Sequence, residues 1–170
     1  MRAPAPLSIA VEPPGGPEFV MLLAAYRAEL DARFPGGFAP PPGWAAGAET
    51  LVPPRGCFLV LRDGGEALGC GAVRVLEPGI AELKHMWLSP KLRGRGLGRE
   101  LLAALETEAT GQLGCQTIRL DTSPLLAEAV ALYRGVGYRE IPRYNQNELA
   151  AIWMERTPGG GSGSASPDNQ

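Results

Sequence analysis

The chain has 170 residues, which suits one domain with a full-sized hydrophobic core and leaves no room for two. A hydrophobic fraction of 45% and a net charge of −2 are typical of an ordinary globular protein and argue against a nucleic-acid-binding surface. Three cysteines without Cys-x-x-Cys spacing and a single histidine support neither a disulfide framework nor a metal site, so we expect no metal, reduced thiols and a cytoplasmic location.

The first third of the chain predicts a strand, a helix and a long loop. Residues 7–12 alternate apolar and polar side chains, as a half-buried strand does. Apolar residues then recur at helical spacing from Phe19 to Leu30, and Pro35-Gly36-Gly37 ends this helix. Residues 35–55 are rich in proline and glycine, and 44–51 can form a short helix within them. So long a stretch with little regular structure is typical of a binding loop or lid.

The middle of the chain predicts an antiparallel meander followed by a helix. Three β-rich runs cover residues 57–62, 66–76 and 80–89. Turn sequences join them, Asp63-Gly64-Gly65 first and Glu77-Pro78-Gly79 second. From Gly96 to Ala109 the apolar period changes to 3.6, and Gly111 and Gly114 close this helix.

The last third predicts a strand, a helix and two more strands. Residues 116–121 form the strand, after which Ser123 is a suitable N-cap and Pro124 a suitable first helical residue. Gly137 ends this helix, and the remaining strands cover 138–141 and 150–155. We therefore expect an α/β fold with a mixed sheet in one domain over residues 1–156, and a disordered Gly/Ser-rich tail over 157–170.

The segment 82–99, ELKHMWLSPKLRGRGLGR, carries the strongest chemical signal. A strand leads into a basic loop, and glycines open a helix whose first N–H groups lack partners within the helix. These amides, the helix dipole and the neighbouring arginines together predict a phosphate site. The segment lacks the Gly-Lys-Ser/Thr ending of a P-loop and the spacing of a dinucleotide fingerprint, but it satisfies [Gln/Arg]-x-x-Gly-x-[Gly/Ala]. The simpler alternative is a glycine-rich turn without a ligand.

This last pattern, formed by Arg93, Gly96 and Gly98, resembles the acetyl-CoA motif of the GNAT acetyltransferase superfamily. The resemblance runs from about Leu7 to Glu155 and includes LYRGVGY at 132–138, which is similar to the superfamily's helix-to-strand signature. RFPGGF, ELKHMWLSP, RLDTS and GYREIPRYN resemble a bacterial branch whose substrates are mostly unassigned.

The resemblance implies a sheet flanked by helices and splayed between its fourth and fifth strands, with the pantetheine arm of acetyl-CoA in the gap. Main-chain N–H groups near Met86 or Trp87 would polarise the thioester carbonyl. The implied cofactor-binding residues are Met86, Trp87, Leu88, Arg93, Gly94, Arg95, Gly96, Leu97, Gly98 and Arg99. Many relatives carry asparagine where this chain has Leu126, so either Thr122 or Ser123 replaces that pantetheine contact or the contact is missing.

Two residues are catalytic candidates under this resemblance. Glu82 is the candidate general base, with a pKa raised by an apolar cleft; alternatively it pairs with Arg74 or Lys84. Tyr133 is the candidate general acid for the leaving thiolate; alternatively it is a core tyrosine. We expect His85 to be structural, because strict alternation turns it away from Glu82 unless a bulge interrupts the strand.

The implied activity is transfer of an acetyl group from acetyl-CoA to a primary amine, either a small molecule or a peptide amine, by direct attack. The amine would lie under the loops 35–55 and 142–149, near Trp44, Glu49, Tyr144 and Asn145. A non-catalytic acyl-CoA-binding sensor or assembly module is the alternative function. Dimers are common in the superfamily, so a homodimer fits the resemblance, whereas we expect neither nucleic-acid nor membrane partners.

Overall fold

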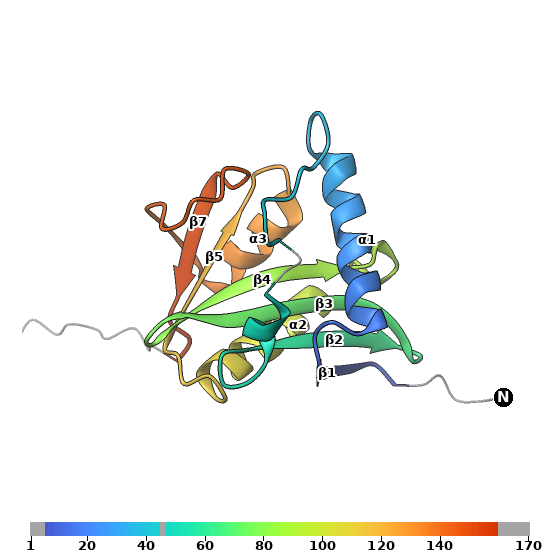
Figure 1. Ribbon diagram of the computed structural model, residues 1–170, viewed down its shortest axis with the longest axis horizontal. Helices are drawn as coiled ribbons and strands as arrows, with labels where there is room; N and C mark the ends of the chain where they lie inside the picture. Colours follow the sequence, from blue (N-terminus) through green and yellow to red (C-terminus); the bar gives the residue numbers. More distant parts are fainter. Residues whose placement is uncertain (1–5, 45–46, 160–170) are drawn as a thin grey trace, which may run out of the picture.

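The computed structural model describes residues 6–44 and 47–159, and the predicted order of elements is confirmed within them (Figure 1). The elements are β1 (Ser8–Glu12), α1 (Pro17–Arg33), η1 (Ala48–Leu51), β2 (Gly56–Asp63), β3 (Glu66–Glu77), β4 (Ile80–Leu88), η2 (Pro90–Leu92), α2 (Leu97–Thr110), β5 (Thr117–Thr122), α3 (Ala127–Val136), β6 (Arg139–Ile141) and β7 (Ile152–Arg156). The two elements labelled η are single turns of 3-10 helix. The expected tail over 157–170 falls outside the described residues from 160 onward, as do residues 1–5 of the expected domain.

All seven strands form one sheet in the order β1-β2-β3-β4-β5-β7-β6. Every neighbouring pair is antiparallel except β4 and β5. The parallel pairing covers only Ile80–Glu82 against Thr117–Arg119. Beyond these residues the two strands diverge, as Figure 1 shows. The mixed sheet splayed between its fourth and fifth strands is therefore confirmed, and the splay leaves the second half of β4 without β5 as a partner.

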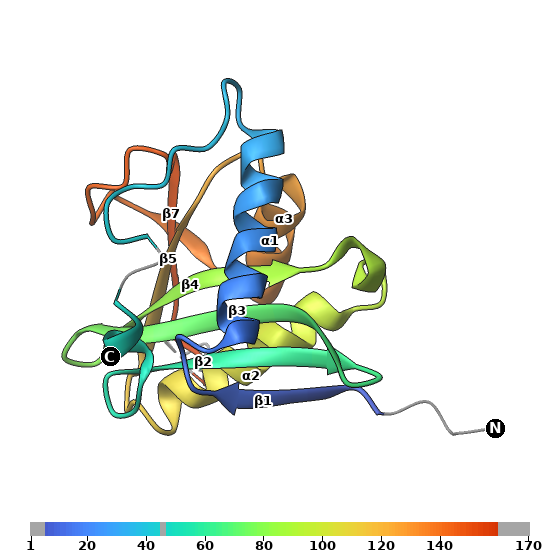
Figure 2. The ribbon, with the colours of Figure 1, turned by 45° about the vertical axis from the view of Figure 1, so that its right-hand side comes forward.

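Helices cover both faces of the sheet, with α1 on one face and α2 and α3 on the other (Figure 2). Alternate residues of β2 serve the two layers because the side-chain period of a strand is two. Phe58 and Val60 pack with Phe19 of α1, while Leu59 packs in the larger cluster around Leu105 of α2.

A bulge interrupts β4 at the point where the sheet begins to open. Cys70 of β3 pairs with Trp87 and Ala72 pairs with Lys84, so two residues of β4, 85 and 86, face one residue of β3. His85 has φ +53°, the left-handed region. The extra residue shifts the side-chain phase: Leu83 packs on the α2 side before the bulge, and Met86 packs there after it.

Two local expectations need correction. Helix α3 begins at Ala127, not directly after Ser123, because residues 123–126 first close a separate turn in which Leu126 N donates to Ser123 O at 2.9 Å. Ser123 Oγ caps this turn by accepting from Leu125 N at 3.2 Å. The short helix expected over 44–51 is a 3-10 turn over Ala48–Leu51, and residues 45–46 lie outside the described part.

Candidate active site

The glycines of the predicted phosphate turn have two distinct roles. Gly94 and Gly96 have φ +77° and +75°, and a Cβ at either would meet no atom within 4 Å. Gly96 is the N-cap of α2 and supplies no side-chain cap. Gly98 lies inside the helix, where a Cβ would contact Leu132 Cδ2 at 3.4 Å. The turn therefore needs glycine at 94 and 96 for its backbone, and it leaves the first amides of α2 uncovered by a capping side chain.

The three arginines of the motif point to different neighbours. Arg93 donates to Leu88 O at 2.9 and 3.2 Å and pairs with Glu29 of α1, with Nη2 2.6 Å from Oε1. Arg95 pairs instead with Asp63 in the β2–β3 turn at 2.9 Å. Arg99 is exposed and lines the cavity described next. Sequence analysis did not identify Glu29; its only local signal is an i, i+4 pairing with Arg33.

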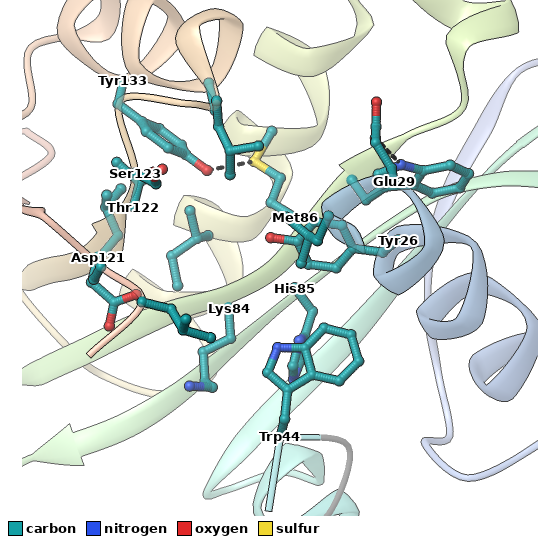
Figure 3. A pocket seen from close by; sticks show the side chains of 18 of the residues that line it. Tyr26, Glu29, Trp44, Lys84, His85, Met86, Asp121, Thr122, Ser123 and Tyr133 are labelled. Carbon is teal, nitrogen blue, oxygen red and sulfur yellow. Dashed lines mark hydrogen bonds between the residues drawn. The ribbon is translucent and has the colours of Figure 1, made fainter. Parts of the chain in front are cut away.

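A cavity of about 910 Å³ opens along the splay between β4 and β5. It extends from the glycine turn, along β4, to the segments 41–44, 47–51 and 145–150. The residues proposed from the sequence that line it are Trp44, Glu82, Met86, Trp87, Leu88, Arg93, Gly94, Gly96, Leu97, Gly98, Arg99, Tyr133 and Asn145. Three others do not line it: Arg95, Glu49, which is exposed on η1, and Tyr144. Figure 3 shows the strand, helix and loop side chains that converge on this cavity.

Glu82 is 2% exposed and held from three directions. Arg74 Nη2 lies 2.8 Å and Lys84 Nζ 3.5 Å from its Oε1, and the Tyr144 hydroxyl donates to Oε2 at 2.9 Å. Burial alone would raise the pKa of the Glu82 carboxyl, but the charges of Lys84 and Arg74 and the hydrogen bonds from Tyr144 and Arg74 outweigh it and lower that pKa. The expected raised pKa is thus wrong, because this part of the cleft is cationic rather than apolar.

The bulge brings His85 to the α1 side of the sheet, where it packs edge-on against Trp44 with ring centroids 5.1 Å apart. Burial, reinforced by the charges of Lys84 and Arg74, lowers the pKa of His85 to about 4. The imidazole is therefore neutral at pH 7. The bulge removes the reason given for a structural role, strict alternation along β4, and places His85 in the cavity lining with Glu82, so the structural role stays a prediction.

Tyr133 of α3 reaches across the cavity toward β4. Its hydroxyl donates to Met86 Sδ at 3.9 Å, as the dashed line in Figure 3 marks, and its ring packs against Tyr138. Burial raises the pKa of the Tyr133 hydroxyl, which therefore stays protonated at neutral pH and can donate a proton.

Asp121, at the end of β5, is a cavity residue that sequence analysis missed. Its Oδ1 accepts from Asn147 Nδ2 at 3.0 Å and its Oδ2 from Asn145 Nδ2, and Asn145 Oδ1 accepts from Trp153 Nε1 at 2.9 Å. This network ties the loop after β6 to the cavity wall. The available signal was the place of Asp121 at the carboxyl end of a splayed strand.

The described residues offer neither a reactive cysteine, nor a metal site, nor a membrane-spanning helix. Burial raises the pKa of Cys57 and of Cys70 to about 12, so both thiols stay protonated and are poor nucleophiles. Within residues 6–44 and 47–159, no three His, Cys, Asp or Glu side chains gather as a metal site would require. Nor does any helix in those ranges have the length and apolar character needed to cross a membrane.

Comparison with known proteins identifies the family. The sequence profile of the acetyltransferase (GNAT) family matches residues 23–138. An IAA acetyltransferase of Azospirillum brasilense is 39% identical over 93 residues, which cover 54% of this chain and 60% of that protein. The match thus spans less than two thirds of that relative's length.

Solved structures agree with this family. A Klebsiella pneumoniae protein assigned as an acyl-CoA N-acyltransferase is 33% identical, with a TM-score of 0.68 and coverage of 89% of this chain and 97% of that one. A GNAT family acetyltransferase of Elizabethkingia anophelis, solved with acetyl-CoA bound, shares the fold at 17% identity, with a TM-score of 0.59 and coverage of 89% and 97%. From its profile match and its mixed, splayed sheet, the chain belongs to the acetyltransferase (GNAT) family.

Proposed function

We propose that this protein transfers the acetyl group of acetyl-CoA to a primary amine by direct attack of the amine on the thioester. The observation that carries the proposal is one continuous cavity. It joins the first amides of α2, which have no capping side chain, the half of β4 that does not pair with β5, and the Tyr133 hydroxyl. Acetyl-CoA would supply the acetyl group; the residues described below would bind it and move protons.

The residues around the glycine turn fit a linked pair of phosphates. Gly94 and Gly96 leave open space where side chains would otherwise stand, and Arg93 and Arg99 line the same end of the cavity. The edge of β4 beyond Glu82, free of β5, can pair with an extended amide-containing arm. We further propose that a hydroxyl of Thr122 or Ser123, both of which line the cavity, replaces the asparagine contact; Ser123 Oγ, although it accepts from Leu125 N, keeps its own proton to donate.

The proton transfers are assigned to two residues. The main-chain N–H near Met86 or Trp87 would donate to the carbonyl oxygen as negative charge develops there. Tyr133 would give its proton to the sulfur when the carbon–sulfur bond breaks. Glu82 would take the amine proton through a water, since its carboxylate is 2% exposed and both oxygens are already bonded.

The acceptor would occupy the end of the cavity walled by Trp44 and Asn145. Tyr144 would act indirectly, by holding Glu82 at 2.9 Å. Glu49, exposed on η1 and outside the cavity lining, would meet only a large acceptor such as a peptide. We propose a cytoplasmic place of action, which the three free and buried cysteines support.

The test is thiol release from acetyl-CoA over a panel of amines. Tyr133→Phe and Glu82→Gln should each lower kcat by about 10²-fold or more, the usual contribution of one acid or base. Tyr138→Phe and Glu106→Gln are matched controls, since each removes a buried hydroxyl or carboxylate outside the cavity. If the parent turns over and both site variants equal it, the residue assignment is wrong.

Thermal stabilisation by CoA distinguishes the alternative of a non-catalytic module. A sensor would be stabilised by CoA and would release no thiol with any amine. An enzyme of the proposed kind would show both.

A further inference from the structure

Within the acceptor end of the cavity, two cations share one buried carboxylate. Arg74 donates to Glu82 Oε1 through both Nε, at 3.0 Å, and Nη2, at 2.8 Å, while Lys84 Nζ reaches the same oxygen only at 3.5 Å. The second oxygen, Oε2, is taken by the Tyr144 hydroxyl. Two cations therefore share the single negative charge of Glu82, which leaves the group with a net positive charge, and Lys84, at the longer distance, is the less tightly held of the two.

The three charged side chains also differ in how much of each is exposed to solvent. The Glu82 side chain is 2% exposed, whereas Lys84 is 33% and Arg74 is 36% exposed, and all three line the cavity. A molecule in the cavity can thus contact the two cations directly, whereas Glu82 would act on it through a water. Figure 3 shows Lys84 between Asp121 and His85 on the floor formed by β4.

Across the splay, on β5, Asp121 is a further charged group that lines the cavity. Its two oxygens accept from the amides of Asn145 and Asn147, which turn it toward the 145–147 loop. These amides carry no charge and do not neutralise the Asp121 carboxylate, which therefore favours a cationic group on its side of the cavity. His85 is neutral at pH 7. An ammonium of Lys84 on one strand and a carboxylate of Asp121 on the other complement a ligand that carries both an amine and an acid.

From this juxtaposition we infer that the acceptor is an amino acid with a free carboxylate, which Lys84 binds. The inference rests on the proposed function and specifies its substrate class. The net charge of about +1 on Arg74, Lys84 and Glu82 together matches the single negative charge of a carboxylate better than the double charge of a phosphate. The ring of Trp44, packed against Phe38 and His85, supplies an apolar wall for the amino acid's side chain.

The test compares alanine, leucine and phenylalanine, each against its own carboxamide, in thiol release by the full chain. The parent should prefer at least one acid over its amide by about tenfold in kcat/KM, the worth of one partly exposed charge contact. Lys84→Met should lower kcat/KM for that acid about tenfold more than for its amide. Lys91→Met removes the chain's other lysine, which pairs with Glu66 outside the cavity, and should leave the preference unchanged.

The inference is overturned if the amides are used as well as the acids, if Lys84→Met lowers both alike, or if other amines react and none of these six compounds does. Failure of the proposed function would look different, as no amine of any kind would release thiol. In that event calorimetry with N-acetylphenylalanine and its amide tests the carboxylate site independently of catalysis. Tighter binding of the acid that is lost in Lys84→Met supports the site, and equal binding of both compounds or no binding refutes it.

Discussion

His85 combines a left-handed backbone, φ +53°, with a buried ring. It is the only histidine of the 170 residues, so no other imidazole titrates between pH 4 and 6.5. In that range the unfolded chain binds a proton at this position that the folded protein does not, because the folded pKa is lowered from 6.5 to about 4. The free energy of unfolding should therefore fall as the pH falls through this window, by up to ~3 kcal/mol from His85.

His85→Asn tests this contribution, because asparagine tolerates the left-handed region and does not titrate. Urea denaturation at pH values from 7 to 4 should give a flatter curve for the variant than for the parent. Glu82 and Glu128, whose pKa values are lowered, lose their contribution only below the ordinary 4.5 and do so in both proteins. Parallel curves would show that His85 is not buried in its neutral form.

Gly96 and Gly98 should respond differently to alanine. Gly96→Ala puts a Cβ on a residue with φ +75° and should destabilise the protein by about 1–2 kcal/mol. Gly98→Ala meets only an ordinary contact at 3.4 Å inside a helix and should leave the melting temperature unchanged or slightly higher. If phosphates approach α2 as proposed, Gly96→Ala should weaken CoA binding in calorimetry, because it distorts the turn that presents the first amides of α2, whereas Gly98→Ala, which the motif allows, should leave CoA binding unchanged. Equal CoA affinity in the parent and Gly96→Ala would argue against that approach.

At the scale of elements, two glycines set how closely neighbouring segments pack on the sheet. A Cβ at Gly56 would lie 2.3 Å from Thr50 O and 2.6 Å from Val73 O, both main-chain atoms of packed segments. A Cβ at Gly71, opposite the β4 bulge, would lie 2.5 Å from Leu105 Cδ1, the end of a flexible side chain on α2. The main-chain atoms around Gly56 cannot move away from an added Cβ, whereas the side chain of Leu105 can change its conformation.

Gly56→Ala should therefore cost more than Gly71→Ala, for which about 1–3 kcal/mol is expected from overpacking. Urea midpoints with unchanged slopes measure the difference. Gly16→Ala is the control, because its Cβ meets nothing within 4 Å, and it should lose only the capping preference of glycine over alanine at the N-cap of α1, about 1 kcal/mol or less. A larger loss at Gly71 than at Gly56 would mean that α2 is the more rigidly seated element.

At the scale of the whole molecule, ion pairs connect α1 to the far side of the cavity. Glu29 pairs with Arg93 at 2.6 Å and accepts from Trp87 Nε1 at 2.6 Å, while Arg33 pairs with Glu128 of α3 at 2.6 Å. These contacts join one helix to the phosphate turn, to β4 and to α3. Glu29 thus holds a negative charge beside the end of the cavity proposed for an anionic cofactor.

Glu29→Gln should tighten CoA binding by about 3- to 10-fold at low salt, because it removes that charge while its amide oxygen can still accept from Trp87. Calorimetry at low and high ionic strength measures the gain, which should shrink with salt. Glu66→Gln is the control, since Glu66 pairs with exposed Lys91 outside the cavity. Weaker CoA binding by Glu29→Gln would show that Glu29 positions Arg93 more than it opposes the cofactor.

Local sequence determined the order of the elements and the phosphate turn. Periods of 2 and 3.6, punctuated by glycine and proline, depend on residues within a few positions of each other, so β2–β4 and α2 were predicted within one or two residues. The role of Gly96 could likewise be predicted from local sequence, because its positive φ is a property of a single turn. The sheet's splay followed from family resemblance and not from these periods.

Tertiary structure decided the charges in the cavity. Tyr144 reaches Glu82 across 62 positions of sequence, and Arg93 reaches Glu29 across 64. No local period encodes such pairs, which is why Glu82 was expected to have a raised pKa. The bulge at His85 likewise needs a partner strand to exist. What one segment does alone could be predicted from the sequence, whereas the ionisation of a buried group depends on which distant segments come to surround it.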